Sequence, residues 1–156
     1  MTTYNFEQIM SQTRRLAAQY RNATGQSLPV TVELARFDAV HLLGLKELAD
    51  AESEAIWVEA GIEKRVQIKG RVIFPGGKSR QRVGQMNLKA PWDYTLLVIY
   101  NDEYQPDAIY RASRETIEQV LDTGSNNKRG AMTVAKFKAI GEQVWPANLN
   151  DEHISH

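Results

Sequence analysis

Three polar side chains from one short region of the chain have the chemistry to bind a metal ion and act on a phosphate. Glu54 lies in the segment SEAIWV (53–58), and Gln67 and Lys69 stand two residues apart in RVQIKGR (65–71). Residues two apart in a β-strand project from the same face, so Gln67 and Lys69 should point the same way. Oxygens of Glu54 and Gln67 can hold a hard divalent cation such as Mg²⁺, with water completing the shell. The Lys69 amine can orient or activate an attacking water and stabilise charge on a phosphate.

Positioning these groups requires a hairpin. The segment 53–58 is rich in β-branched and aromatic residues, and the segment 65–74 alternates between apolar and polar side chains. Gly61 marks the turn between them, and Pro75-Gly76-Gly77 ends the second strand. The pair is therefore predicted to be antiparallel. Two helices should precede it, one over about 6–23 with Asn5 as its N-cap and one from Pro29 to about Leu48, with a bend near Gly44.

The second half of the chain predicts further strands and two closing helices. The apolar run Tyr94–Tyr100 is typical of a central strand that is buried on both faces. A polar loop over 78–91 should precede it, and a strand over 108–112 should follow. Ser113 caps a predicted helix over 114–122, and Thr133 caps a last helix that carries Val144 inward and stops at Pro146.

This order of elements predicts an α/β protein with a mixed central β-sheet of about four strands flanked by helices. A single domain is expected over 1–146, followed by a flexible tail over 147–156. The chain has 156 residues and no cysteine, so disulfides, thiol catalysis and thiolate metal sites are excluded. No segment approaches a membrane-spanning length and no signal pattern opens the chain, so no membrane partner and a cytoplasmic location are expected.

The formal net charge is zero, which argues against coating of nucleic acid by bulk charge. The charges are nevertheless unevenly placed, because the charged residues over 38–63 are mainly acidic and every charged residue over 64–89 is basic. Four of these basic residues come directly after Lys69, and two more basic residues lie in the loop 125–130. Both groups are expected to contact DNA phosphates. The predicted nucleic-acid contacts are Arg71, Lys78, Arg80, Arg82, Lys128 and Arg129.

The hairpin SEAIWVEAGIEKRVQIKGR resembles the core of the PD-(D/E)XK, or restriction-endonuclease-like, nuclease superfamily. In that pattern an acid closes the first strand, an acid-spacer-lysine triad lies on the second, and a glutamate often comes from the preceding helix. The resemblance assigns Glu54 to the first acid, Gln67-Ile68-Lys69 to the triad and Glu33 to the helical glutamate. It covers the order of elements over about 28–122. It implies Mg²⁺ or Mn²⁺ bound by Glu54, Gln67 and Glu33, with Lys69 completing the catalytic set.

Two residues depart from the superfamily pattern. Glu54 stands where aspartate is usual, and the neutral Gln67 stands where the triad normally begins with an acid. Five other acids can replace Glu54 if the expected register is wrong: Asp38, Asp50, Glu52, Glu59 and Glu63.

The resemblance implies a DNA endonuclease, a phosphodiester hydrolase that leaves a 5′-phosphate. So small a chain is expected to act as a homodimer or as a subunit of a larger nuclease system. The alternative is a catalytically eroded nuclease-fold module that binds nucleic acid or a protein partner, which the neutral Gln67 favours. A third interpretation is an unrelated α/β protein in which the hairpin is purely structural.

Overall fold

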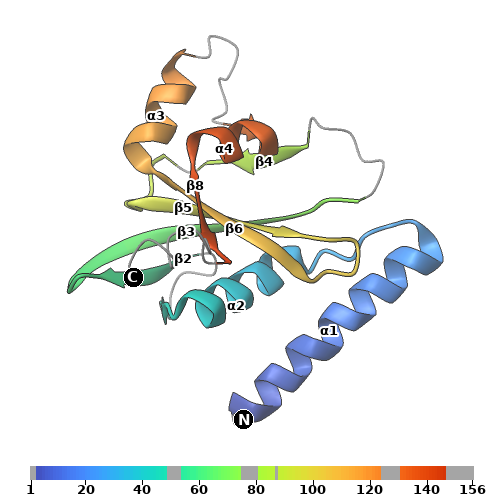
Figure 1. Cartoon of the computed structure of the whole chain (residues 1–156). Coiled ribbons are helices and arrows are strands. Elements are labelled where there is room, and N and C mark those ends of the chain that lie inside the picture. Colours follow the sequence, from blue (N-terminus) through green and yellow to red (C-terminus); the bar gives the residue numbers. More distant parts are fainter. Residues whose placement is uncertain (1–2, 49–53, 75–80, 87, 124–130, 147–156) are drawn as a thin grey trace, which may run out of the picture.

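The computed structural model describes residues 3–48, 54–74, 81–86, 88–123 and 131–146 (Figure 1). Its helices are α1 (Thr3–Thr24), α2 (Thr31–Leu43), α3 (Arg114–Thr123) and α4 (Val134–Ile140). Its strands are β1 (Lys46–Glu47), β2 (Glu54–Glu59), β3 (Ile62–Val72), β4 (Arg82–Gln85), β5 (Tyr94–Tyr100), β6 (Pro106–Ser113), β7 (Ala131–Thr133) and β8 (Glu142–Trp145). Among the helices described, none is both long and apolar enough to cross a membrane.

The described strands form a six-stranded sheet in the order β1-β2-β3-β5-β6-β8 and a separate pair, β4 with β7. Strands β3 and β5 run parallel, and every other pair is antiparallel. The mixed α/β architecture is confirmed, as is the antiparallel hairpin of β2 and β3. The expected strand number was too low, because the edge strands β1 and β8 contain only two and four residues. Segments this short carry no readable alternation of polar and apolar residues.

The central strand β5 divides the interior into two cores. Leu96, Val98 and Tyr100 belong to a core that includes buried residues of α1 and α2. Leu97 and Ile99 alternate with them and belong to a second core with residues of α3, α4, β4 and β7. Figure 1 shows α1 and α2 on one side of the sheet and α3 and α4 on the other. Strand β5 is therefore covered on both faces, as its apolar run predicted.

Helix α2 packs closely on β3 because Gly70 has no side chain. A Cβ atom at residue 70 would lie 2.7 Å from the Cβ atom of Ala35. Gly70 thus fixes which face of β3 turns toward α2, and its neighbours in the strand turn the other way. The helix was predicted to continue to Leu48, but it ends at Leu43. Gly44 follows with φ of 67°, and its N–H donates to the Val40 carbonyl, which closes the helix.

The C-terminal helix is shorter than the sequence predicted. Helix α4 begins at its expected cap, where the Thr133 hydroxyl accepts a hydrogen bond from the Lys136 N–H at 3.1 Å. It ends at Ile140, and Val144 lies in the edge strand β8 beside β6. Gly141 permits this switch, because a Cβ atom there would approach the Arg111 carbonyl oxygen to 2.7 Å. The predicted tail, 147–156, lies outside the described residues.

Candidate active site

The hairpin register brings three of the predicted groups to one face of the sheet. Glu54 of β2 stands directly opposite Gln67 of β3, so their side chains lie on the same face. Lys69 follows two residues along β3 on that face. The face is turned away from α2, because Gly70 lies against α2 and alternate residues of β3 point oppositely. Glu54, Gln67 and Lys69 therefore lie on one face of the sheet, as the spacing predicted.

Gln67 is buried, with 5% of its surface exposed, and its amide has a defined orientation. The amide nitrogen donates to the Thr95 hydroxyl at 3.2 Å and points at the Met86 sulfur at 3.8 Å. Thr95 lies on β5, and Glu54 lies on β2 at the other side of β3. The amide nitrogen of Gln67 is therefore turned toward β5.

The Glu54 carboxylate is only half satisfied. Its side chain is 13% exposed, and its Oε2 atom accepts a hydrogen bond from Nη2 of Arg65 at 2.9 Å. Its Oε1 atom is buried and has no hydrogen-bond partner in the described part of the chain. A buried acceptor without a donor is costly, about 1–3 kcal/mol or more for a charged group. A cation between the Glu54 and Gln67 oxygens would remove this cost.

Lys69 is half-buried beside this pair. Burial and the nearby charge of Arg71, in that order of size, lower the pKa of the Lys69 amine. Both effects disfavour the protonated form. At any given pH a larger fraction of Lys69 is therefore neutral than for an exposed lysine, which suits an amine that handles a proton of water.

Arg71, one of the predicted phosphate contacts, is already engaged with the backbone. Its guanidinium donates to the carbonyl oxygens of Arg82 at 2.8 Å, of Gly70 at 2.6 Å and of Val83. Through its bonds to Arg82 and Val83, Arg71 joins β4 to β3. The segment 78–91 was predicted to be a loop, but its residues 82–85 form a strand because they pair with β7. Arg82 itself is exposed. The other predicted contacts, Lys78, Arg80, Lys128 and Arg129, lie outside the described residues.

Glu33 does not join the shared face. It is exposed on α2, which covers the opposite face of the sheet. There it lines a pocket of about 330 Å³ together with Arg36 of the same helix and Glu47 of β1. Residues 3–48, 54–74, 81–86, 88–123 and 131–146 contain no group of three acidic or histidine side chains placed to hold a metal ion. Of the three predicted metal ligands, only Glu54 and Gln67 therefore lie on the shared face.

The alternative first acids are placed elsewhere. Asp38 forms an ion pair with Arg14 on the side of α1 and α2. Glu59 pairs with Arg111, and the exposed Glu63 lies 3.6 Å from Lys46. Asp50 and Glu52, two further alternatives, lie outside the described residues. None of the three described alternatives can take the place of Glu54 opposite Gln67.

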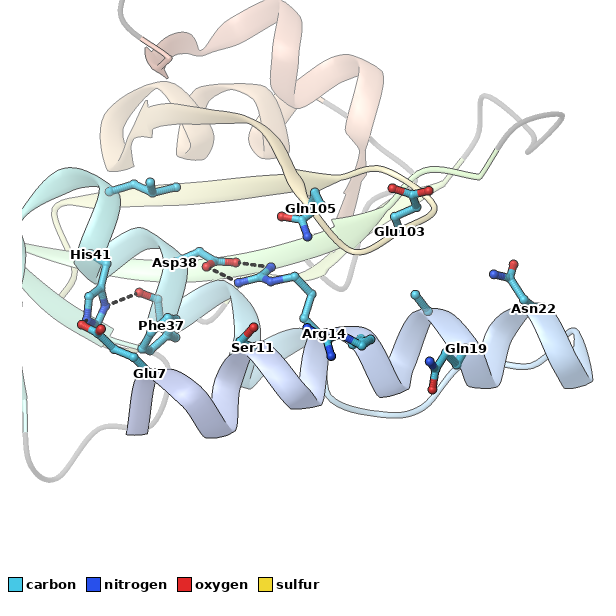
Figure 2. A pocket seen from close by; sticks show the side chains of 13 residues that line it. Glu7, Ser11, Arg14, Gln19, Asn22, Phe37, Asp38, His41, Glu103 and Gln105 are labelled. Atoms are coloured by element: carbon cyan, nitrogen blue, oxygen red, sulfur yellow. Dashed lines mark hydrogen bonds and ion pairs between the residues drawn. The ribbon is translucent and has the colours of Figure 1, made fainter. Parts of the chain in front are cut away.

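A second polar cavity, of about 650 Å³, is lined by residues of α1, α2 and the turn between β5 and β6 (Figure 2). At its base Arg14 binds both carboxylate oxygens of Asp38, at 2.6 and 2.9 Å. The Tyr100 hydroxyl donates to the same carboxylate at 2.6 Å, and Arg14 also donates to the Tyr104 carbonyl at 2.6 Å. Because these groups satisfy one another, we interpret them as a structural clamp between α1, α2 and the sheet.

Sequence reasoning missed two residues of the site, Arg65 and Thr95. Alternation in the sequence places Arg65 on the same face as Gln67 and Lys69, but nothing in the sequence showed that it pairs with Glu54. Thr95 carries no such signal, because its position beside Gln67 depends on the parallel register of β3 and β5.

A search of protein-family models finds no match to this chain, and a search of curated proteins finds none either. The class that the structure defines is a mixed α/β protein whose sheet is covered on both faces.

Proposed function

We propose that this protein is a metal-dependent nuclease that hydrolyses phosphodiester bonds in DNA, with a restriction-endonuclease-like arrangement of Glu54, Gln67 and Lys69. The observation that carries the proposal is the buried Oε1 atom of Glu54, which has no hydrogen-bond partner in the described part of the chain and lies on the residue directly opposite Gln67. Carboxylate and amide oxygens are ligands that suit a hard divalent cation such as Mg²⁺ or Mn²⁺. The residues present therefore fit such an ion.

In this proposal Glu54 and Gln67 would hold the cation, which when bound would supply positive charge that stabilises the reacting phosphate. Lys69 holds and orients the attacking water from the adjacent position of β3, and its lowered pKa favours the neutral amine that accepts a proton. The water oxygen forms a bond to phosphorus while the bond from phosphorus to O3′ breaks. The leaving O3′ takes up a proton from solvent, and the product carries a 5′-phosphate.

The proposed DNA contact rests on the charges around this pair. Arg65 lies on the same face of β3, and Arg82 is exposed on β4, which Arg71 ties to β3. Both cations can meet phosphates on either side of the bond that is cut. A chain this small has little surface for reading a base sequence, so we propose that it works as a homodimer or within a larger nuclease system.

Incubation of supercoiled plasmid with the protein and Mg²⁺ or Mn²⁺ tests the proposal. Lys69→Ala should lower the rate of nicking by about 10²–10⁴, the usual contribution of a positioned acid–base group. Glu54→Gln should lower it similarly, with Mn²⁺ binding measured separately by calorimetry. Glu63→Gln is the matched control, because that carboxylate is exposed and lies in the same hairpin. Nicking that Lys69→Ala leaves unchanged would remove Lys69 from the mechanism.

A second candidate function is supported by the charge balance of the site. Three basic residues, Arg65, Lys69 and Arg71, accompany the single carboxylate of Glu54 on this face of β3. This excess of positive charge favours binding of a phosphate chain, as expected of an eroded nuclease-fold module that only binds nucleic acid. DNA binding that weakens with salt, without cleavage of any DNA or RNA in Mg²⁺ or Mn²⁺, would favour this module.

A further inference from the structure

The ion pair between Glu54 and Arg65 has an unsatisfied atom on each side. Oε1 of Glu54 and Nε of Arg65 are both buried, and neither has a hydrogen-bond partner in the part of the chain that the structure describes. A guanidinium can bind a carboxylate through two parallel hydrogen bonds, but here one bond, from Nη2 to Oε2, joins the two groups. Each partner thus keeps unused capacity for another ligand of opposite charge.

Arg65 is fixed at its backbone and accessible at its side chain. Its N–H donates to the Asp93 carboxylate at 2.8 Å, and its carbonyl accepts from the Asp93 N–H at 2.7 Å. The side chain is 38% exposed, whereas the Glu54 side chain is 13% exposed. A ligand from solvent can therefore reach the exposed part of the guanidinium while hydrogen bonds to Asp93 hold the Arg65 backbone in place. Arg71 differs, because its donors are bound to backbone carbonyls.

We propose that Arg65 exchanges partners, pairing with Glu54 in the metal-free protein and with a DNA phosphate when the metal site is filled. This inference rests on the proposed nuclease function and adds a role for a residue outside the Glu54–Gln67–Lys69 set. Binding of a cation to Glu54 competes with Arg65 for the same carboxylate. Binding of a phosphate to Arg65 competes with Glu54 for the same guanidinium. Each ligand therefore helps the other to bind, and this coupling is reciprocal by thermodynamic linkage.

Calorimetric titration with Mn²⁺ alone tests the first half of the exchange. Arg65→Gln should tighten Mn²⁺ binding by about two- to fivefold, the range expected when a partly exposed ion pair no longer competes. Lys64→Gln is the matched control. It removes one positive charge from the residue directly before Arg65, whose side chain points to the other face of β3. Equal effects of the two substitutions would show that net charge alone acts, and the exchange would be refuted.

DNA binding in EDTA tests the second half through a double-mutant cycle. A fluorescent duplex oligonucleotide should bind Glu54→Gln about two- to fivefold more tightly than the unchanged protein, because Arg65 is released. The same change made in Arg65→Gln should produce no gain, since the guanidinium that it would release is absent. A gain of equal size in both backgrounds would contradict the exchange. Circular dichroism of each variant confirms that it is folded.

The two failures can be told apart. If the unchanged protein nicks DNA and binds Mn²⁺, but Arg65→Gln behaves like Lys64→Gln in both titrations, the exchange is wrong and the nuclease proposal stands. If neither the unchanged protein nor Arg65→Gln binds Mn²⁺ and no DNA is cut, the nuclease proposal is wrong. The partner exchange, which rests on it, is then wrong as well.

Discussion

Asp38 fastens α1 and α2 to the sheet, and Asp38→Asn would remove its charge while keeping its volume. Asp38 is 5% exposed, and its carboxylate accepts three hydrogen bonds, two from Arg14 and one from the Tyr100 hydroxyl. In the variant an amide NH₂ replaces one carboxylate oxygen, so a donor must face another donor. The Arg14 guanidinium also loses its counter-charge. We therefore expect a large loss of stability from this single atom change.

The magnitude follows from the burial of the pair. Removing one partner of a buried ion pair costs about 3–5 kcal/mol. The Arg14 side chain is 12% exposed, and it keeps its bond to the Tyr104 carbonyl, so the lower limit of about 3 kcal/mol applies. With a urea dependence of ~2 kcal/mol per molar, the unfolding midpoint should fall by about 1.5 M. The melting temperature should fall by about 6–12 °C for a chain of this size.

Urea unfolding followed by circular dichroism measures this loss. Glu63→Gln is the control, because its ion pair with Lys46 is exposed and should contribute less than about 1 kcal/mol. The double variant Arg14→Gln with Asp38→Asn should cost less than the sum of the single changes, since the two side chains share one interaction. A midpoint for Asp38→Asn that moves no further than that of Glu63→Gln would refute the clamp.

Three further outcomes follow from the same contacts. Burial, followed by the charge and hydrogen bond of Asp38, raises the pKa of Tyr100. The contribution of neutral Tyr100 to the free energy of unfolding should therefore be fully present below about pH 10 and decrease above it. Tyr100→Phe should make this decrease smaller in urea titrations at alkaline pH. Gly70→Ala should destabilise the fold by about 1–3 kcal/mol through its clash with Ala35, and adding Ala35→Gly should recover part of the loss in thermal unfolding. Gln67→Glu should tighten Mn²⁺ binding by roughly tenfold in calorimetry, since a second carboxylate would then contribute to the proposed site; unchanged affinity would refute a site at Gln67.

The sequence predicted correctly those helices and strands whose secondary structure is determined by their own residues. The apolar run of β5 and the alternation of β3 each indicate a strand wherever the neighbours lie. Thr133 likewise caps α4 through a bond to a residue three positions on. The same alternation placed Gln67 and Lys69 on one face, and the hairpin register then brought Glu54 opposite.

Longer-range packing determined what the sequence could not reveal. Val144 repeats the helical spacing of Phe137 and Ile140, yet pairing with β6 and the close approach at Gly141 make its segment a strand. Glu33 was assigned to the metal site from its place in the order of elements. Whether Glu33 can reach that site depends on which face of the sheet α2 covers, and the packing of Ala35 on Gly70 places α2 on the opposite face. Side-chain partners such as Glu54 and Arg65 depend on register in the same way.

The neutral Gln67 has a physical consequence for how the proposed nuclease would be controlled. A single carboxylate that is already paired with Arg65 would be a weak site for a divalent cation in the absence of substrate. Mg²⁺ commonly completes its shell with substrate phosphates when the protein offers only one or two carboxylates. The metal would then be bound tightly only with DNA present, because the phosphate both ligates the ion and draws Arg65 away from Glu54. Mn²⁺ affinity should accordingly rise when a duplex oligonucleotide is added to Lys69→Ala, in which cutting is suppressed, and an affinity indifferent to DNA would separate metal binding from substrate binding.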